Sequence, residues 1–234
     1  MKILAFESTA KAASVALCED EFLIAQSYQN SGLTHSTTLM PMAEDLLKNC
    51  GVKLADVDCL AVAVGPGSFT GLRIGISTVK GLGWGADKPC VGVSTLEAMA
   101  WNLAHMDATI CCAMDARRKQ VYNAIFRAQN GTLERLCEDR AISLEELAQE
   151  RDGQTQMVVG DGAELCYNDA KGRGQHLVLA PAHLRFQNAW GVARAALERA
   201  KRGEFVSGAE LTANYLRLSQ AERERLEKQK EGTN

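Results

Sequence analysis

The chain has 234 residues, of which 46% are apolar and 24% charged. This is an ordinary globular composition, and it excludes disordered, collagen-like and coiled-coil proteins. Lysine and arginine number 26 and aspartate and glutamate 29, for a net charge of −3. The chain as a whole therefore lacks the basic surplus of a non-specific nucleic-acid binder, although a local basic patch stays open.

The eight cysteines show no C-x-x-C spacing, and several of them fall inside apolar runs. We therefore expect buried free thiols in a reducing compartment. No apolar run approaches the roughly 20 residues of a membrane helix, and the N-terminal residues turn polar too soon for a signal peptide. These features predict a soluble cytoplasmic protein that makes no contact with a membrane.

The first half of the chain predicts three strands, a helix, a strand and a helix, and then one more strand and helix. Short apolar runs that are separated by two or three polar residues favour antiparallel hairpins, and Gly51 is expected to end the first helix. The expected strands are 3–6, 13–17, 22–28, 60–64 and 89–93, and the expected helices are 35–50, 70–85 and 96–103.

The second half repeats this order at an offset of roughly 106 residues. Asn130-Gly131 predicts a hairpin turn, and Ser143 with Glu146 predicts a capping box. The expected strands are 109–114, 121–126, 133–140, 157–159 and 177–179, and the expected helices are 144–150, 162–168 and 188–202. The repeat predicts two α/β lobes, each with a mixed sheet, that meet near residues 105–107.

We place the first lobe at 1–106, the second at 107–206 and a C-terminal segment at 207–234. Residues 219–231 predict a charged helix. Its alternating charges favour a solvated face that is stabilised by neighbouring ion pairs, with recognition of a partner as the alternative.

Two short polar motifs stand at equivalent places in the repeat. Glu7-Ser8-Thr9 follows the first strand, and Met114-Asp115-Ala116-Arg117-Arg118-Lys119 ends the first strand of the second lobe. A carboxylate beside hydroxyl or basic side chains can hold a phosphate or a metal-bound phosphate. An ordinary polar turn is the preferred interpretation of the first motif, and a charged turn is an equally good interpretation of the second.

The stretch from Gly65 to Gly75, GPGSFTGLRIG, follows a buried strand and opens a helix. Glycines at a helix start allow close backbone approach, and the helix N-terminus favours an anion. The stretch lacks the Gly-Lys-Ser/Thr of a P-loop. We therefore favour close packing of this helix against another helix, in the same lobe or in a partner, over phosphate binding.

The histidines and cysteines predict no metal site, because no two histidines stand at helical spacing and the cysteines have no zinc-site spacing. No Ser-His-Asp set is apparent either. Scattered cations could form a basic patch, although a solvated face is the preferred interpretation. These are Arg117, Arg118, Lys119, Lys171, Arg173 and Arg185.

The sequence resembles the TsaB (YeaZ) family of bacterial tRNA threonylcarbamoyladenosine biosynthesis proteins. The likeness covers nearly the whole chain, and 65–75 is its most specific part. The other matching stretches are 3–9, 14–17 and 114–118. The resemblance implies an actin-like (ASKHA) fold of two RNase H-like lobes with duplicated β-β-β-α-β-α topology, and a C-terminal helix that packs back on the first lobe.

The family has a catalytic sibling, TsaD, which transfers threonylcarbamoyl to N6 of adenosine 37 in tRNAs that read codons beginning with A. This chain keeps the sibling's first glutamate as Glu7 but departs from its other motifs. It has Lys11 and Ala12 in place of acids, Thr95 and Met99 in place of metal-binding histidines, and Met114 to Arg117 in place of a Ser-Gly-Gly turn. Losing the imidazoles removes the metal, and losing the glycines removes close approach to phosphate.

The resemblance therefore implies a non-catalytic subunit with no metal and no cofactor. It implies that this subunit binds a TsaD-type catalytic subunit and supports a TsaE-type ATPase, with tRNA engaged indirectly through the complex. The expected interface lies on the helices 35–48 and 70–85, where exposed methionine suits an adaptable contact. Its residues are His35, Leu39, Met40, Met42, Thr70, Leu72, Arg73 and Ile76. The same surface could form a symmetric homodimer when the sibling is absent.

Three alternatives remain open on the sequence. The first is an actin-like ATPase or small-molecule kinase, since a weak nucleotide site could persist between the lobes. Its residues would be Glu7, Ser8, Thr9, Asp115 and Arg117. The second is a peptidase, for which no nucleophile–base pair is visible. The third is a dimeric interaction module unrelated to tRNA.

Overall fold

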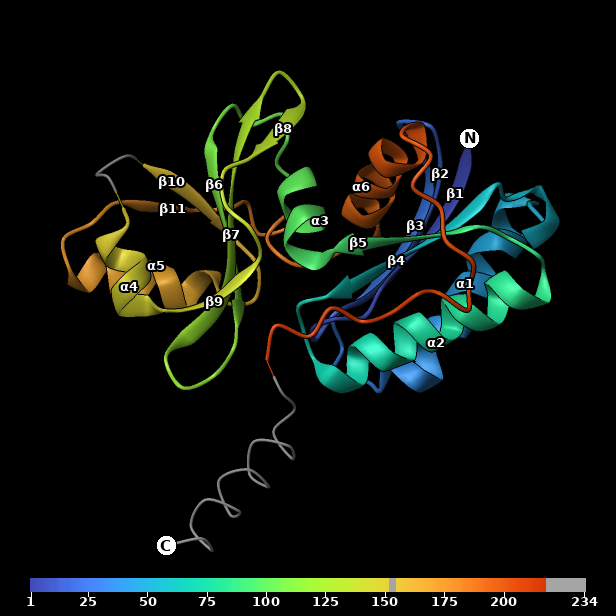
Figure 1. The fold of residues 1–234 in the computed structure, drawn as a ribbon, viewed down its shortest axis with the longest axis horizontal. Helices are drawn as coiled ribbons and strands as arrows, with labels where there is room; N and C mark the ends of the chain where they lie inside the picture. Colours follow the sequence, from blue (N-terminus) through green and yellow to red (C-terminus); the bar gives the residue numbers. More distant parts are fainter. Residues whose placement is uncertain (152–154, 218–234) are drawn as a thin grey trace, which may run out of the picture.

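The computed structural model describes residues 1–151 and 155–217. Its first lobe is built on a five-stranded sheet in which β1 is antiparallel to β2 and parallel to β4, in the order β3-β2-β1-β4-β5 (Figure 1). The elements are β1 (Lys2–Glu7), β2 (Ala13–Glu19), β3 (Phe22–Gln29), α1 (His35–Cys50), a short 3₁₀ helix (Leu54–Asp56), β4 (Cys59–Gly65), α2 (Phe69–Gly85), β5 (Cys90–Ser94) and α3 (Thr95–Trp101).

The second lobe repeats this topology. Its sheet has the order β11-β10-β6-β7-β8, and β9 also pairs with β7. The elements are β6 (Thr109–Asp115), β7 (Gln120–Gln129), β8 (Thr132–Arg135), β9 (Arg140–Ser143), α4 (Leu144–Gln149), β10 (Gln156–Val159), α5 (Ala163–Gly172), β11 (Leu177–Leu179) and α6 (Ala189–Lys201). The predicted class, two α/β lobes of the same topology, is confirmed.

The local end signals act as expected. Gly51 has a φ of 66° and ends α1, and Ser143 with Glu146 forms the predicted capping box at the start of α4. The single strand expected over 133–140 is wrong, because the chain leaves the sheet between β8 and β9. Asp139 lies in this break, where its carboxylate accepts hydrogen bonds from Arg135 and from Ser94 of the first lobe.

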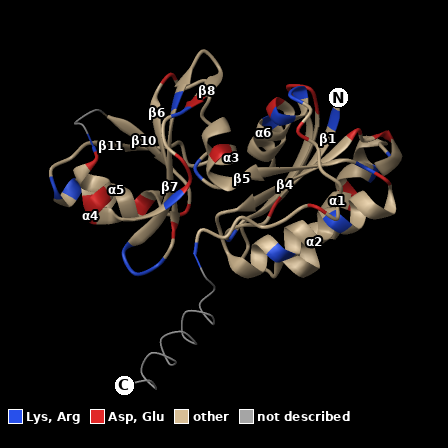
Figure 2. Cartoon of the chain, in the orientation of Figure 1, with Lys and Arg blue, Asp and Glu red and all other residues tan. Residues whose placement is uncertain are grey.

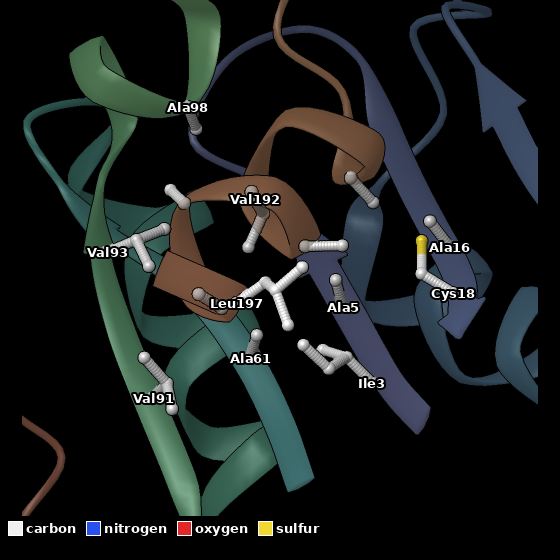
Figure 3. Close-up of a cluster of buried hydrophobic side chains, with 14 of the residues drawn as sticks. Ile3, Ala5, Ala16, Cys18, Ala61, Val91, Val93, Ala98, Val192 and Leu197 are labelled. Carbon is white, nitrogen blue, oxygen red and sulfur yellow. The ribbon is translucent and has the colours of Figure 1, made fainter. Parts of the chain in front are cut away.

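The last helix of each lobe packs on the sheet of the other lobe. α1 and α2 cover one face of the first sheet, and α6 covers its second face (Figure 1). Val192 and Leu197 of α6 belong to one core cluster with Ile3 of β1 (Figure 3). In exchange, α3 packs with the second sheet, where Leu96 and Met99 share a core with strand residues of β6 and β7.

This exchange corrects the lobe boundaries that the sequence suggested. Residues 189–201 fall inside the expected second lobe but complete the core of the first, and residues 95–101 do the reverse. The two exchanged helices also touch each other, since a Cβ built at Gly191 would lie 2.0 Å from the carbonyl oxygen of Ala98. Only a residue without a side chain permits that approach, so Gly191 sets the contact between the lobes.

Residues 206–217, which we call the strap, return from α6 along the first lobe. Val206 pairs with Cys90, and Leu211 is buried in the core beneath α1 and α2. Asn214 N donates to Val64 O over 2.7 Å. Arg217 then reaches the second lobe, where its Nη1 donates to Ala116 O over 2.9 Å. The helix expected at 219–231 lies outside the described residues.

The cysteines are free thiols, and six of the eight are buried. Burial raises the pKa of Cys18 and of Cys59 to about 12, so these thiols stay protonated and serve as small apolar core residues. No helix within residues 1–151 and 155–217 is long and apolar enough to cross a membrane.

Candidate functional site

The first polar motif forms a tight turn at the end of β1. Glu7 is fully buried, and its Oε1 accepts hydrogen bonds from both the backbone N and the Oγ1 of Thr9, each over 2.6 Å. Its Oε2 has no hydrogen-bond partner within the described structure. Burial raises the pKa of Glu7 to about 7, although the bonds from Thr9 oppose this shift. The carboxyl group is thus held inside the protein and is partly protonated at neutral pH.

The second polar motif forms a turn at the end of β6 with the same carboxylate-to-backbone hydrogen bond. Asp115 Oδ1 accepts a hydrogen bond from the backbone N of Arg117 over 2.7 Å, and Asp115 Oδ2 pairs with Arg117 Nη1 over 3.0 Å. The Arg117 side chain is 82% exposed. The two motifs therefore occupy equivalent places, as the repeat predicts, but only the first is enclosed.

Asp161 brings a third carboxylate to this region from the loop after β10. It raises the pKa of Glu7 through like charge, and burial raises its own pKa. A hydrogen bond from Gln187 Nε2, over 2.9 Å, opposes that rise. From the sequence, Gly160-Asp161-Gly162 was predicted only as a helix start. β4 and β10 are equivalent strands, each parallel to the first strand of its lobe. The matching position of residues 65–67 after β4 and of 160–162 after β10 was the signal that could have identified Asp161.

The glycines at the start of α2 bring this helix against the end of β1. A Cβ at Gly71 would lie 2.1 Å from Ser8 O, and a Cβ at Gly67 would lie 2.7 Å from Thr9 O. Ser8 Oγ also donates to Gly71 O over 2.9 Å. Close packing is therefore the role of these two glycines. The expected helix–helix contact is wrong at these glycines, because their neighbour is the turn after β1.

A cavity of about 680 Å³ lies between the lobes and the strap. Of the predicted cleft residues, Thr9, Asp115 and Arg117 line it, whereas Glu7 and Ser8 lie buried and do not line it. Residues that the sequence did not assign to the cleft also line it. They are Lys11, Ser68, Phe69, Tyr122, Asp161, Arg185, Asn214, Tyr215 and Arg217.

The predicted interface residues divide by exposure. Leu39 and Leu72 are 1% exposed, and Met42 and Ile76 are 7% exposed, because all four belong to the core of the first lobe. The expectation of an exposed methionine at Met42 is therefore wrong. Thr70 and Arg73 are exposed, and His35 and Met40 are half-buried. His35 Nε2 lies 2.7 Å from Ala10 O, which ties the start of α1 to the loop after β1.

No group of three histidine, cysteine, aspartate or glutamate side chains is arranged to hold a metal ion within residues 1–151 and 155–217. In the same ranges no serine or cysteine side chain is hydrogen-bonded to a histidine, and His35 meets a carbonyl oxygen. The polar side chains around the cavity are mainly carboxylates, hydroxyls and guanidinium groups.

A family model described as "TsaD: tRNA N6-adenosine threonylcarbamoyltransferase" matches residues 29–173. The tRNA threonylcarbamoyladenosine biosynthesis protein TsaB of Bacillus subtilis (strain 168) is 34% identical over 236 residues, which cover 98% of this chain and 100% of that protein. The chain belongs to the TsaB family. The TsaB of Escherichia coli (strain K12) is 37% identical over 153 residues, 64% of this chain and 66% of that protein.

A solved structure of YeaZ from Pseudomonas aeruginosa has the same fold as this TsaB-family chain. The TM-score is 0.80 at 29% identity, and the match covers 92% of this chain and 99% of the other. The resemblance to the TsaB (YeaZ) family, expected from the sequence, is confirmed. The two-lobed α/β fold is that of YeaZ.

Proposed function

We propose that this protein is a non-catalytic subunit in the formation of N6-threonylcarbamoyladenosine at position 37 of tRNAs that read codons beginning with A. In this role it binds a TsaD-type catalytic subunit and supports a TsaE-type ATPase. Its relatives are named tRNA threonylcarbamoyladenosine biosynthesis proteins, and the family model that matches it carries the transferase name. Both lines of likeness lead to the same modification.

The state of the cleft supports the absence of catalysis. The first carboxylate, Glu7, is buried and hydrogen-bonded by Thr9 instead of lining the cavity. The start of α2, where an anion would be favoured, is packed against the same turn, since Ser68 N donates to Thr9 O over 2.7 Å. These two groups stabilise the fold of the first lobe and are not presented to a substrate.

The outer face of the first lobe supports a role in assembly. α1 and α2 lie side by side on this face (Figure 1), and β3 forms the edge of the sheet beside α1. A groove of about 450 Å³ runs between β3 and α1 and is lined by Thr37, Pro41 and Met42, among others. We propose that the partner interface lies on this outer face of α1 and α2, next to the groove, with Met40, Thr70 and Arg73 as its accessible residues. The same face would pair two copies of the chain in the absence of the catalytic subunit.

Introducing two negative charges on this face tests whether it binds the catalytic subunit. In the Met40→Glu/Thr70→Glu variant, both substitutions affect half-buried or exposed side chains, so the fold is expected to persist. We expect co-purification with the catalytic subunit and reconstituted tRNA modification to fall at least tenfold together, because a buried unpaired charge at an interface is costly. Val178, 45% exposed on β11, gives the matched control Val178→Glu. Unchanged co-purification of the double variant would contradict this interface.

The cavity between the lobes keeps a nucleotide-binding alternative testable. Its volume of about 680 Å³ is sufficient for a small molecule, and Lys11, Arg117 and Arg185 line it. Titration of ATP with Mg²⁺, followed by a thermal shift, separates the two functions. We expect no micromolar binding by this chain alone. A clear shift accompanied by ATP turnover would favour an actin-like ATPase or kinase and would contradict the non-catalytic assignment.

A further inference from the structure

The tip of the β6–β7 hairpin presents three consecutive cations in an unusual backbone conformation. Arg117, Arg118 and Lys119 have φ values of 65°, 54° and 57°, which lie in the left-handed region. Residues with side chains rarely adopt it, and three in succession are uncommon. Backbone hydrogen bonds hold the tip in place, since Gln120 N donates to Arg117 O over 3.1 Å and Leu144 N donates to Lys119 O over 3.1 Å. Strain of this kind points to a functional segment.

This tip forms an exposed basic loop at the end of the second lobe (Figure 2). The tip borders the cavity between the lobes through Arg117, and two further cations line this cavity. Arg217 of the strap donates to Ala116 O, next to the tip, and Lys11 lines the cavity from the first lobe. Lys11, Lys119 and Arg217 form no ion pair with a carboxylate within residues 1–151 and 155–217, in contrast to Arg117 with Asp115.

The cavity also contains Asp115, Asp161 and Glu164. Arg117 pairs with Asp115 and Arg185 with Glu164, so these two cations are already neutralised. The cations that remain for a bound anion at this rim include Lys11, Lys119 and Arg217.

The first-lobe side of the same cavity carries a stack of rings. The Phe69 and Tyr215 rings have centroids 4.9 Å apart, and the Arg73 guanidinium lies 3.9 Å from the Phe69 centroid. Arg73 Nε also donates to Tyr215 Oη over 3.3 Å, which fixes the orientation of the tyrosine. Tyr215 remains 43% exposed, so part of it is accessible at the rim.

We propose that this rim binds single-stranded RNA, with phosphates at Lys11, Arg118 and Lys119 and a base stacked on Tyr215. A groove lined by cations and exposed aromatic rings is the usual design for unpaired nucleic acid. An acidic protein surface would use the cations but has no need of the ring stack. The proposal rests on the proposed function for its natural RNA, an unmodified tRNA, and it replaces the expectation that tRNA is engaged only indirectly.

The test removes the rim charges and measures RNA binding directly. The variant Lys11→Gln/Arg118→Asn/Lys119→Asn removes three charges, and asparagine is among the residues that best tolerate the left-handed region. The control Lys171→Gln/Lys201→Gln/Arg202→Gln removes three cations elsewhere on the surface. The probes are a fluorescent RNA stem–loop with an unpaired loop and a fully paired RNA duplex, and anisotropy is followed over a salt series.

We expect the rim variant to bind the stem–loop about tenfold more weakly, with a salt slope reduced by about 0.7 for each phosphate that the variant no longer neutralises. The control variant should bind as the unaltered chain does. Tyr215→Leu should weaken stem–loop binding about fivefold and leave duplex binding unchanged, because a base–ring stack needs an unpaired base. Equal binding by the rim variant and the unaltered chain, or no salt-dependent binding by either, would overturn the proposal.

Co-purification with the TsaD-type subunit separates this inference from the proposed function. If the rim variant retains the catalytic subunit but loses RNA, both proposals stand. If it loses the catalytic subunit and binds RNA normally, the rim is a protein contact and the RNA inference fails. If the unaltered chain binds RNA through the rim yet never assembles with the catalytic subunit, the assembly proposal fails and the RNA inference stands.

Discussion

The turns at the ends of β1 and β6 share one hydrogen bond but differ in backbone conformation and in surroundings. In each, a carboxylate accepts the backbone N–H of the residue two positions later, at 2.6 Å for Glu7 and 2.7 Å for Asp115. The first turn is buried beneath the start of α2, and the second continues into an exposed basic loop. Only the second turn continues through three left-handed residues, 117–119. The duplicated topology thus places a carboxylate at both strand ends, while the packing of neighbouring segments decides which of the two turns is accessible.

The largest effect is expected where the first turn is sealed. In Gly71→Ala the new methyl group would meet the backbone oxygen of Ser8, which cannot move without displacing the end of β1. We expect a loss of about 3 kcal/mol in the free energy of unfolding, measured by urea denaturation. Gly81 lies in the same helix with open space around it, so Gly81→Ala should stabilise the protein by about 1 kcal/mol. Equal stability of the two variants would contradict the tight packing of Gly71 against the first turn.

The pH dependence of stability tests the buried carboxylate of the first turn. Glu7 has a pKa of about 7 in the folded protein against a usual 4.5, so the folded state holds this proton after the unfolded chain has released it. The contribution of Glu7 to stability therefore decreases as the pH rises from 4.5 to 7 and is level above that. The free energy of unfolding of Glu7→Gln, taken relative to that of the unaltered protein, should therefore be about 2 kcal/mol higher at pH 8 than at pH 5.

Thermal unfolding of the Glu7→Gln variant at several pH values measures this effect. The matched change at the second turn, Asp115→Asn, controls for the loss of a carboxylate at an equivalent strand end, where the side chain is 29% exposed and pairs with Arg117. A Glu7→Gln profile parallel to that of the unaltered protein would show that the buried carboxyl group is ionised throughout this range.

The smallest effect concerns the backbone of the exposed loop. Lys119 has a φ of 57°, and asparagine adopts this conformation more readily than lysine does. We expect Lys119→Asn to stabilise the protein by about 0.5 kcal/mol and Lys119→Val to destabilise it by about 1 kcal/mol, because a β-branched side chain is least suited to this region. Chemical denaturation of both variants measures the difference, and the reverse order would argue against a left-handed loop.

Most strands and helices could be predicted from the sequence, because apolar runs, Gly51 and the Ser143 capping box are local signals. The break between β8 and β9 could not, since it depends on Asp139 meeting Ser94, which is distant in the sequence. The exchange of α3 and α6 was equally out of reach, because an apolar helix face does not identify the sheet that it covers. The burial of Met42 could not be predicted for the same reason, because the sequence does not show how far the sheet extends beneath α1.

The candidate site was predicted in part. The residues Thr9, Asp115 and Arg117 line the cavity as expected, and they are adjacent to recognisable strand ends. Tyr215 and Arg217 were missed, because they reach the cavity only through the strap, whose path no local pattern predicts. Asp161 was missed because the two halves repeat element by element and not residue by residue.

The return of α6 to the first sheet has a consequence for synthesis on the ribosome. The strand face that carries Ile3, Ala5 and Ala61 is covered largely by residues 189–201, and Leu211 completes the opposite core. A nascent chain must therefore expose this apolar face until almost all of its length has emerged. Strands β1 and β4 thus complete their packing only after α6 has been made, which leaves a long interval during which a chaperone can bind them.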